Sequence, residues 1–255
     1  MTGTMSRRAE EVFGERAVYY AESTAHSDQD ELRRIVELVR PDGSERMLDV
    51  ATGPGHIAFA FSPFVHQVVG IDLTPQMLDL ASKIAKERGI GNAQFVRADV
   101  ANLPFPDQSF DLVTCRRAAH HFLDPEGALR EMRRVLRAGG KMLIEDRSVP
   151  EDSYVDETLN HLDVLHDPSH VREYRLGEWR AMLDSSGLRT VSESFLTKHR
   201  PIGSLTDTAG PDEAREILRI IYAMSDQERK RMNIEIVEGR ITIDHYLVMI
   251  LALRD

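Results

Sequence analysis

Apolar runs and segments with helical spacing alternate along the first 150 residues. The spacing of Leu32, Ile35 and Val39 predicts an amphipathic helix over residues 28–40. Short apolar runs predict buried strands at residues 46–51, 67–72, 93–99, 109–115 and 141–146. Because helical segments separate these strands, the pattern predicts right-handed crossovers and a parallel sheet that helices cover on both faces.

Boundary residues support the helices of this pattern. Thr74 and Pro75 suit the N-cap and the first turn of a helix that Gly89 ends. Another helix opens at Asp124, which precedes a proline, and is predicted to close near the glycines at 139 and 140.

The pattern changes after residue 150. Residues 153–174 are polar and rich in histidine, and a short helix that ends at Gly187 follows them. Residues 189–199 and 245–254 are strand-like, and the segment from 201 to about 231 has helical spacing between them. The second half of the chain therefore predicts two more strands, with a helical segment inserted between them.

Composition narrows the classes of function. The chain of 255 residues has 42 acidic and 32 basic residues and a formal charge of −10, which disfavours a surface that tracks nucleic-acid phosphates. Cys115 is the only cysteine, so the chain has neither an internal disulfide nor a cysteine-rich zinc site, and it suits a reducing compartment. The N-terminal segment lacks a signal-peptide core, and no run approaches the ~18 apolar residues of a membrane span. We expect a cytoplasmic protein.

A glycine loop and acidic residues follow the predicted strands. Ligands of open parallel sheets bind at the carboxyl ends of the strands. Gly53 and Gly55 allow a tight turn after the first strand, and Asp49 precedes that turn, where a carboxylate suits a cationic ligand better than a pyrophosphate. Asp72 at the second strand end can accept hydrogen bonds from ribose hydroxyls, and Asp99 at the third can pair with an adenine amino group. For each carboxylate by itself, a helix cap or a solvated loop end is the alternative interpretation.

These motifs resemble the class I S-adenosylmethionine (SAM)-dependent methyltransferases, the group that includes the UbiE-type quinone-ring enzymes. MLDVATGPG, VVGID with LTPQML, and RADVANLPFPDQSFDLVTC carry the resemblance, which covers about residues 30–147. HLDVLHDPSHVREYRLGEW more loosely resembles YcgJ-like small-molecule methyltransferases. Ala51 stands where many members have their first glycine, a change that the family tolerates.

The resemblance implies an α/β, Rossmann-like, doubly wound fold. Its sheet has seven strands in the order 3-2-1-4-5-7-6, mostly parallel with strand seven antiparallel, and N-terminal helices and a helical lid insertion complete it. We expect a single domain over residues 1–255. It is divided into an N-terminal helical cap (1–40), a SAM-binding core (41–150) and two insertions that shape an acceptor pocket (150–175 and 201–240).

The resemblance also implies a cofactor site for SAM and its product S-adenosylhomocysteine (SAH). The loop after the first strand would line the methionine part, Asp72 would hold the ribose, and Asp99 with Val100 would flank the adenine. Asp49 would orient the loop and balance the cationic cofactor. The implied cofactor-binding residues are Asp49, Ala51, Thr52, Gly53, Gly55, Asp72, Leu73, Met77, Asp99, Val100, Cys115 and Arg116.

Methyl transfer is an in-line displacement, so the protein must chiefly align the reacting atoms, and a base near neutral pKa helps when the acceptor carries a proton. His120 and His121 follow the fourth strand, and we expect at most one of them to face the substrate as a base. The candidates for acceptor contact are Tyr20, His166, His170 and Arg172. No ligand pattern such as HExxH is present, so we expect no metal.

Two other functions remain open from the sequence. The loop from Gly53 reads G-x-G-x-x-A, a variant that NAD(P)-dependent oxidoreductases also permit. A non-catalytic SAM- or SAH-binding protein would carry the same fold. For the methyltransferase we expect a small-molecule acceptor of unknown identity, no nucleic acid and no membrane span. A homodimer is the expected assembly, because it is the commonest one.

Overall fold

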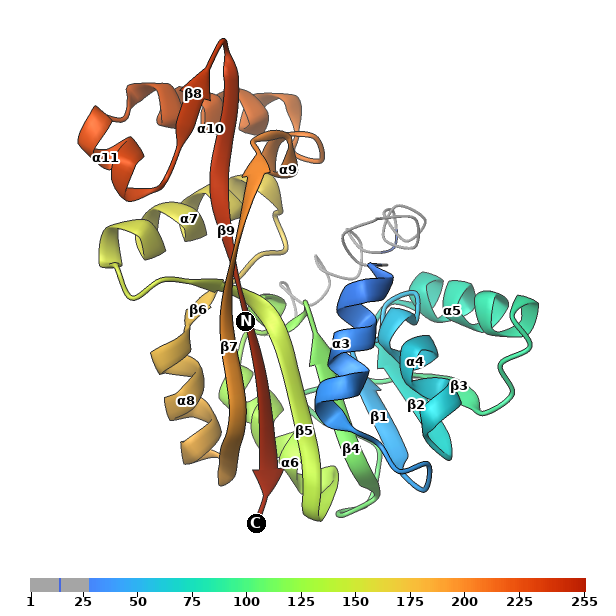
Figure 1. The fold of residues 1–255 in the computed structure, drawn as a ribbon. Helices are drawn as coiled ribbons and strands as arrows, with labels where there is room; N and C mark the ends of the chain where they lie inside the picture. The colour runs from blue at the N-terminus through green and yellow to red at the C-terminus, as the bar shows by residue number, and fades with distance from the viewer. Residues whose placement is uncertain (1–13, 15–27) are drawn as a thin grey trace.

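The computed structural model describes Gly14 and residues 28–255, and a mixed β-sheet forms its centre (Figure 1). The strands run across the sheet in the order β3-β2-β1-β4-β5-β9-β7. In chain order these strands are β1 (Arg46–Val50), β2 (Gln67–Asp72), β3 (Ala93–Arg97), β4 (Phe110–Arg116), β5 (Leu136–Val149), β7 (Leu188–Pro201) and β9 (Arg240–Arg254).

The strand pairing confirms the predicted topology. β1, β2, β3, β4 and β5 pair in parallel, whereas β9 runs antiparallel to both β5 and β7. With β7 and β9 counted as the sixth and seventh strands, the order is the expected 3-2-1-4-5-7-6. Two short strands were not predicted: β6 (Tyr174–Arg175) pairs in parallel with the end of β5, and β8 (Glu235–Val237) pairs with the start of β9.

Helices cover both faces of the sheet, as the alternation of strands and helices predicts (Figure 1). Apolar side chains of α3 (Gln29–Val39) and α4 (His56–Phe61) pack on one face, and α5 (Pro75–Glu87) packs beside them against β3. On the other face, α6 (Pro125–Val135) and α8 (Leu176–Ser185) pack against the sheet around the buried Trp179. Apolar burial on both faces is the main stabilising term of this layered arrangement.

The predicted end of the helix after Asp124 is wrong. α6 ends at Val135, and the chain enters β5 at once, five residues before the predicted strand start. The glycines at 139 and 140 lie within β5, where the pairing with β4 shifts register, and Gly139 has a φ of +72°. These glycines therefore form a β-bulge rather than a helix cap. A Gly-Gly dipeptide suits either structure, because glycine readily adopts the positive φ that both can require.

A second apolar core lies beyond the carboxyl end of β5. It brings together α7 (Ser153–His166), α9 (Gly203–Thr206), α10 (Pro211–Ala223) and the β8–β9 hairpin, while α11 (Asp226–Arg231) follows α10 (Figure 1). Asp152 caps α7 by accepting from the N–H groups of Tyr154 and Val155, a signal that explains the helix in the polar, histidine-rich segment. We call the elements between residues 201 and 240, together with α7, the upper helical layer.

The N-terminal cap is described only from α3 onward, so the predicted helices before it lie outside the described residues. Asp28 is the N-cap of α3, in agreement with the helix predicted to start at residue 28. Within the described part of the chain, no helix combines the length and the apolar character that crossing a membrane requires.

The upper helical layer depends on its own core, so a truncation there should destabilise it. Ile217 on α10 is fully buried, and we expect Ile217→Ala to lower the free energy of unfolding by about 2–5 kcal/mol, because it removes buried methyl groups and leaves a cavity. Tyr222 on the same helix is 56% exposed, and Tyr222→Ala should change that free energy by less than about 0.5 kcal/mol. Guanidinium unfolding followed by circular dichroism measures both, and equal losses would contradict the packing of α10.

Candidate functional site

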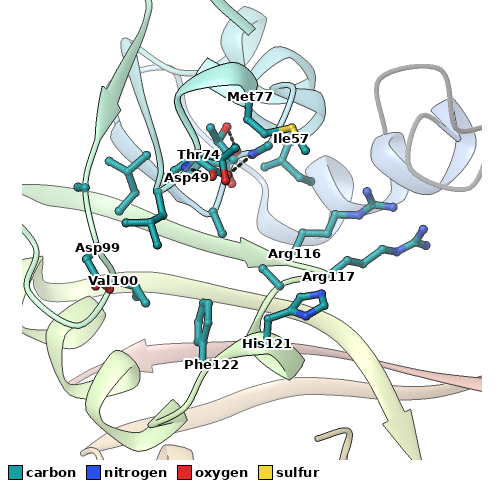
Figure 2. Close-up of a pocket in the computed structure, with 18 of the residues that line it drawn as sticks. Asp49, Ile57, Thr74, Met77, Asp99, Val100, Arg116, Arg117, His121 and Phe122 are labelled. Carbon is teal, nitrogen blue, oxygen red and sulfur yellow. Dashed lines mark hydrogen bonds between the residues drawn. The ribbon is translucent and has the colours of Figure 1, made fainter. Parts of the chain in front are cut away.

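A cavity of about 440 Å³ opens at the carboxyl ends of β1, β2, β3 and β4 (Figure 2). Its described lining lies in four segments that follow these strands, within residues 49–57, 71–77, 98–101 and 116–124. The position is the one that parallel sheets favour for ligands, because four loops and two helix starts converge there. The volume suits a small molecule or cofactor.

The loop after β1 has a backbone that ordinary residues seldom adopt. Gly53 and Gly55 have φ values of +54° and +93°, and a Cβ on Gly55 would lie 2.7 Å from the ring of Phe59. Ala51 also has a positive φ, +53°, at the position where many members of the family have glycine. Left-handed backbone in non-glycine residues is strained and tends to occur at functional sites.

Asp49 lies buried beneath this loop and ties it to the sheet. Its carboxylate accepts hydrogen bonds of 2.7 Å from the hydroxyls of Thr52 in the loop and of Thr114 on β4. Burial raises the pKa of Asp49 from 3.8 to about 6, although the two hydroxyls and Arg116 oppose the rise. The carboxylate is therefore a costly buried charge that the hydrogen bonds only partly stabilise.

Asp72 at the end of β2 connects two cavity loops. One carboxylate oxygen accepts from the N–H of Gly53 at 2.9 Å, and the other accepts from the N–H of Thr74 at 2.9 Å. Burial raises the pKa of this carboxyl group, while the backbone donors oppose the rise. Asp72 also lines the cavity, where a carboxylate can accept from a ligand hydroxyl.

The far end of the cavity is more open. Asp99 is exposed on the wall, and its carboxylate accepts from the N–H of Ala101 at 2.9 Å. Val100 lies beside it on the wall, and the buried Met77 lines the cavity nearer Ile57 and Thr74, as Figure 2 shows. A carboxylate beside apolar side chains can bind a flat heterocycle that carries an amino group.

Two arginines form the opposite side of the cavity (Figure 2). Arg116 ends β4 and Arg117 follows it, and both donate to Glu31 of α3, at 2.7 and 2.5 Å. Both also pair with the buried Glu145 of β5. Lys198 of β7 is a third donor to Glu31, at 2.7 Å, and these cations lower the pKa of Glu31 to about 2 against the effect of burial.

The two adjacent histidines have different surroundings. His121 lines the cavity, and its Nδ1 lies 3.1 Å from the carbonyl oxygen of Ser169. His120 is not on the cavity wall: it is buried, with Nδ1 2.5 Å from the carboxylate of Asp146 and its ring against His121. Burial lowers the pKa of both histidines.

The structure brings most of the predicted cofactor residues to one cavity. Ten of them are on its wall: Asp49, Ala51, Thr52, Gly53, Asp72, Leu73, Met77, Asp99, Val100 and Arg116. Gly55 lies behind the loop as the N-cap of α4, and Cys115 is buried in the sheet, where burial raises the pKa of its thiol.

The residues predicted to contact the acceptor lie elsewhere. His166 bonds to the carbonyl of Leu205, and His170 bonds to the side chain of Asn160. Arg172 pairs with Asp156 and Glu178, and none of the three lines the cavity. Tyr20 lies outside the described residues.

Sequence reasoning missed part of the wall. Thr74, Arg117 and Phe122 line the cavity, and all three follow a predicted strand end within a few residues. Their position after a strand was the available signal, but nothing in the sequence shows which side chains of such a loop turn inward. Across the described residues, no three His, Cys, Asp or Glu side chains form a group that could hold a metal ion.

Comparison with known proteins identifies the family. A model described as a methyltransferase domain matches residues 48–144. The uncharacterized methyltransferase YcgJ of Bacillus subtilis is 43% identical over 176 residues, which are 69% of this chain and 70% of that protein. The chain belongs to the class I SAM-dependent methyltransferases.

Solved structures support this assignment over most of the chain. The crystal structure of YcgJ superposes with a TM-score of 0.80 and 36% identity, covering 88% of this chain and 97% of that one. A putative methyltransferase from Bacillus halodurans matches with a TM-score of 0.85 and 31% identity, covering 88% and 99%. The C-methyltransferase UbiE of Pseudomonas putida is 37% identical over 132 residues, 50% of this chain and 52% of that enzyme. This methyltransferase therefore uses SAM as its methyl donor.

The cavity has the features that SAM requires. Carboxylates at successive strand ends can accept from ribose hydroxyls and amino groups, and they favour a sulfonium cation. The loop beside Asp72 leaves room for a ligand, because a Cβ built on Gly53 would meet nothing within 4 Å. The residues present thus fit the cofactor.

The raised pKa of Asp49 predicts a pH-dependent difference in stability. With a pKa of about 6 in the folded state and 3.8 in the unfolded state, the carboxyl group of Asp49 binds its proton more tightly when the protein is folded. The bound proton therefore stabilises the folded state below pH 4, and this stabilisation is lost as the pH rises through 6. Asp49→Asn cannot titrate at this position, so the variant does not lose stability in this way. We therefore expect the free energy of unfolding of the variant, relative to the wild type, to rise by about 2–3 kcal/mol between pH 4 and pH 7.

Urea unfolding at several pH values, without cofactor, measures this difference. Asp79→Asn, on the exposed side of α5, is the control and should give a difference that stays flat. A flat difference for Asp49→Asn as well would show that the buried carboxylate is not destabilised.

Proposed function

We propose that this SAM-dependent methyltransferase binds SAM in the cavity at the strand ends and methylates a small molecule at the side of Arg117 and His121. One observation carries the proposal: carboxylates from three strand ends lie on one side of a single cavity, and the arginines and His121 lie on the other. SAM supplies an activated methyl group on a sulfonium, and the protein has to align the acceptor with it.

The cofactor would be held chiefly by backbone groups and carboxylates. Asp72 would accept from the ribose hydroxyls, while Asp99 and Val100 would bind the adenine edge at the open end of the cavity. The loop at residues 51–53 would face the methionine part. Asp49 would keep that loop in place through Thr52 and would favour the positive charge of the donor.

Binding of the cofactor tests the assignment of the cavity. We expect micromolar affinity for SAM and for SAH and none for NADH. Asp72→Ala should weaken both adenosyl ligands by about tenfold to a hundredfold, because it removes hydrogen bonds to a charged acceptor and releases the loop at Gly53. Isothermal titration calorimetry measures these affinities.

Asp79→Asn serves as the control, since Asp79 lies on an exposed part of α5 outside the cavity wall. Binding of NADH, or unchanged affinities in Asp72→Ala, would contradict the assignment. SAM binding without methyl transfer to any acceptor of a broad panel would favour a non-catalytic SAM-binding protein. The panel should include quinone-ring carbons and oxygen, nitrogen and sulfur nucleophiles.

His121 is the better placed of the two candidate bases. The carbonyl oxygen of Ser169 can only accept, so we assign the hydrogen of His121 to Nδ1 and the lone pair to Nε2. Burial lowers the pKa of His121, so the ring is neutral at pH 7 and can accept a proton. His120, by contrast, bonds to Asp146 behind the cavity wall, and we assign it the role of supporting the His121 ring.

Asp167 positions the partner of His121. Its carboxylate accepts from the N–H of Ser169 at 2.8 Å and from its hydroxyl at 2.6 Å, which holds the Ser169 carbonyl toward His121. The negative charge of Asp167 also raises the pKa of His121 against the effect of burial. Asp167 is thus a positioning residue for the proposed base.

This arrangement predicts a tautomer and a pKa shift. In protein labelled with ¹⁵N-histidine and saturated with SAH, His121 should be the Nδ1–H tautomer at pH 7, with a pKa below 6.5. Asp167→Asn should lower that pKa further, because it removes a nearby negative charge. Two-bond ¹H–¹⁵N correlation spectra over a pH series report both properties, and His121→Gln assigns the resonance.

Asp184→Asn, in an exposed position on α8, is the control and should leave the His121 titration unchanged. An Nε2–H tautomer, or a His121 pKa that Asp167→Asn does not change, would contradict the assigned role of Asp167.

The cytoplasmic location and the homodimer stay predictions from the sequence.

A further inference from the structure

Arg200 lies on a cationic face of the long β7–β9 hairpin. Within the antiparallel pairing, Lys198 lies opposite His245 and Arg200 lies opposite Ile243. Residues two apart on a strand, and residues directly opposite on neighbouring strands, point to the same side of a sheet. Arg200, Lys198 and His245 therefore share one face, and Arg147 joins them because it pairs with Leu247 of β9.

The same face meets the arginine side of the cavity. Glu31 connects them, because its carboxylate accepts from Lys198 at 2.7 Å and from Arg117 of the cavity wall at 2.5 Å. Arg200 follows Lys198 by two residues in the direction of the upper helical layer, which begins with α9. Arg200 thus lies on the hairpin face that Glu31 joins to Arg117 of the cavity wall.

The arginines and the lysine near Arg200 are already paired with carboxylates. Arg117 bonds to Glu31 and Glu145, and Lys198 bonds to Glu31. Arg147, which is partly buried, pairs with Asp163 and with Glu173. None of these groups has an unpaired charge to offer a ligand.

Arg200 differs from them. It is partly buried, and within the described residues its side chain has neither a hydrogen bond nor an ion pair. Burial and the like charges of Arg117 and Arg147 lower its pKa, and Glu31 and Asp28 oppose that effect only from a distance. A guanidinium in this position is destabilised unless an anion binds it, and its planar fork matches a carboxylate or a phosphate.

We propose that Arg200 binds an anionic group of the methyl acceptor, a carboxylate or a phosphate. The proposal rests on the proposed function, because it names the class of acceptor for the same site. The acceptor would place its anion at Arg200 and its reacting atom toward the cavity, between Arg117 and His121. The charge pattern would then orient the acceptor opposite to the cationic donor.

The test uses the full chain saturated with SAH and three probes: benzoate, its neutral isostere benzamide, and inorganic phosphate. Saturation-transfer NMR measures the two aromatic probes, and ³¹P line width measures phosphate, all at one ionic strength set with sodium chloride. We expect the wild type to bind benzoate or phosphate, and to bind benzamide at least about tenfold more weakly than benzoate. Arg200→Gln should lose about tenfold or more of the anion affinity.

Arg240→Gln is the matched control, since Arg240 is an exposed arginine of the same hairpin. It should bind the anion as the wild type does. Binding of benzoate but not phosphate would indicate a carboxylate acceptor, and the reverse would indicate a phosphorylated one.

Three results would overturn the proposal: no anion binding by the wild type, equal binding in Arg200→Gln, or equal binding of benzamide and benzoate. A fall in SAH affinity of Arg200→Gln would also overturn it, because Arg200 would then belong to the cofactor site. SAH binding is measured separately in each variant. Failure of the wild type to bind SAH would instead count against the proposed function.

Discussion

The buried carboxylate of Asp49 is the constraint on which the rest of the site depends. It holds the loop after β1 through Thr52 and the neighbouring strand through Thr114, so the strand ends that form the cavity keep a common geometry. Burial of a charge is unfavourable by itself, and the raised pKa of Asp49 shows that burial disfavours the ionised carboxylate. A cationic ligand above the loop would offset part of it. The same group that destabilises the protein without ligand can therefore favour the charged methyl donor.

A separation of charge organises the cavity around this carboxylate. Asp72 and Asp99 lie at the ends of two strands on one side, whereas Arg116 and Arg117 lie on the other and are held by Glu31 and Glu145. Because Glu31 also binds Lys198, it joins the cavity to the long β7–β9 hairpin. The paired arginines form this side of the cavity wall, and Arg200 lies on the adjoining hairpin face with a charge that no described carboxylate neutralises in an ion pair.

Much of the fold could be predicted because its signals are local. Apolar runs and capping residues such as Asp28 and Pro75 indicate strands and helix starts within a few residues. The end of α6 was mispredicted because the glycines at 139 and 140 suit a bulge as well as a helix end. The site was predicted where a polar residue ends a strand, as Asp72 does. It was missed where the turn of a loop decides the direction of a side chain, as at Arg117 and Phe122.

The sequence by itself determined the alternation of strands and helices, the acidic residues at three strand ends and the resemblance to SAM-dependent methyltransferases. These features are encoded in short segments, so spacing and residue type are enough to show them. Only the tertiary structure decided which histidine lines the cavity and which partners hold it, because Ser169 lies 48 residues from His121. It likewise brought Glu31 and Lys198 together across 167 residues. Contacts between such distant residues arise from the packing of whole elements, which no local pattern specifies.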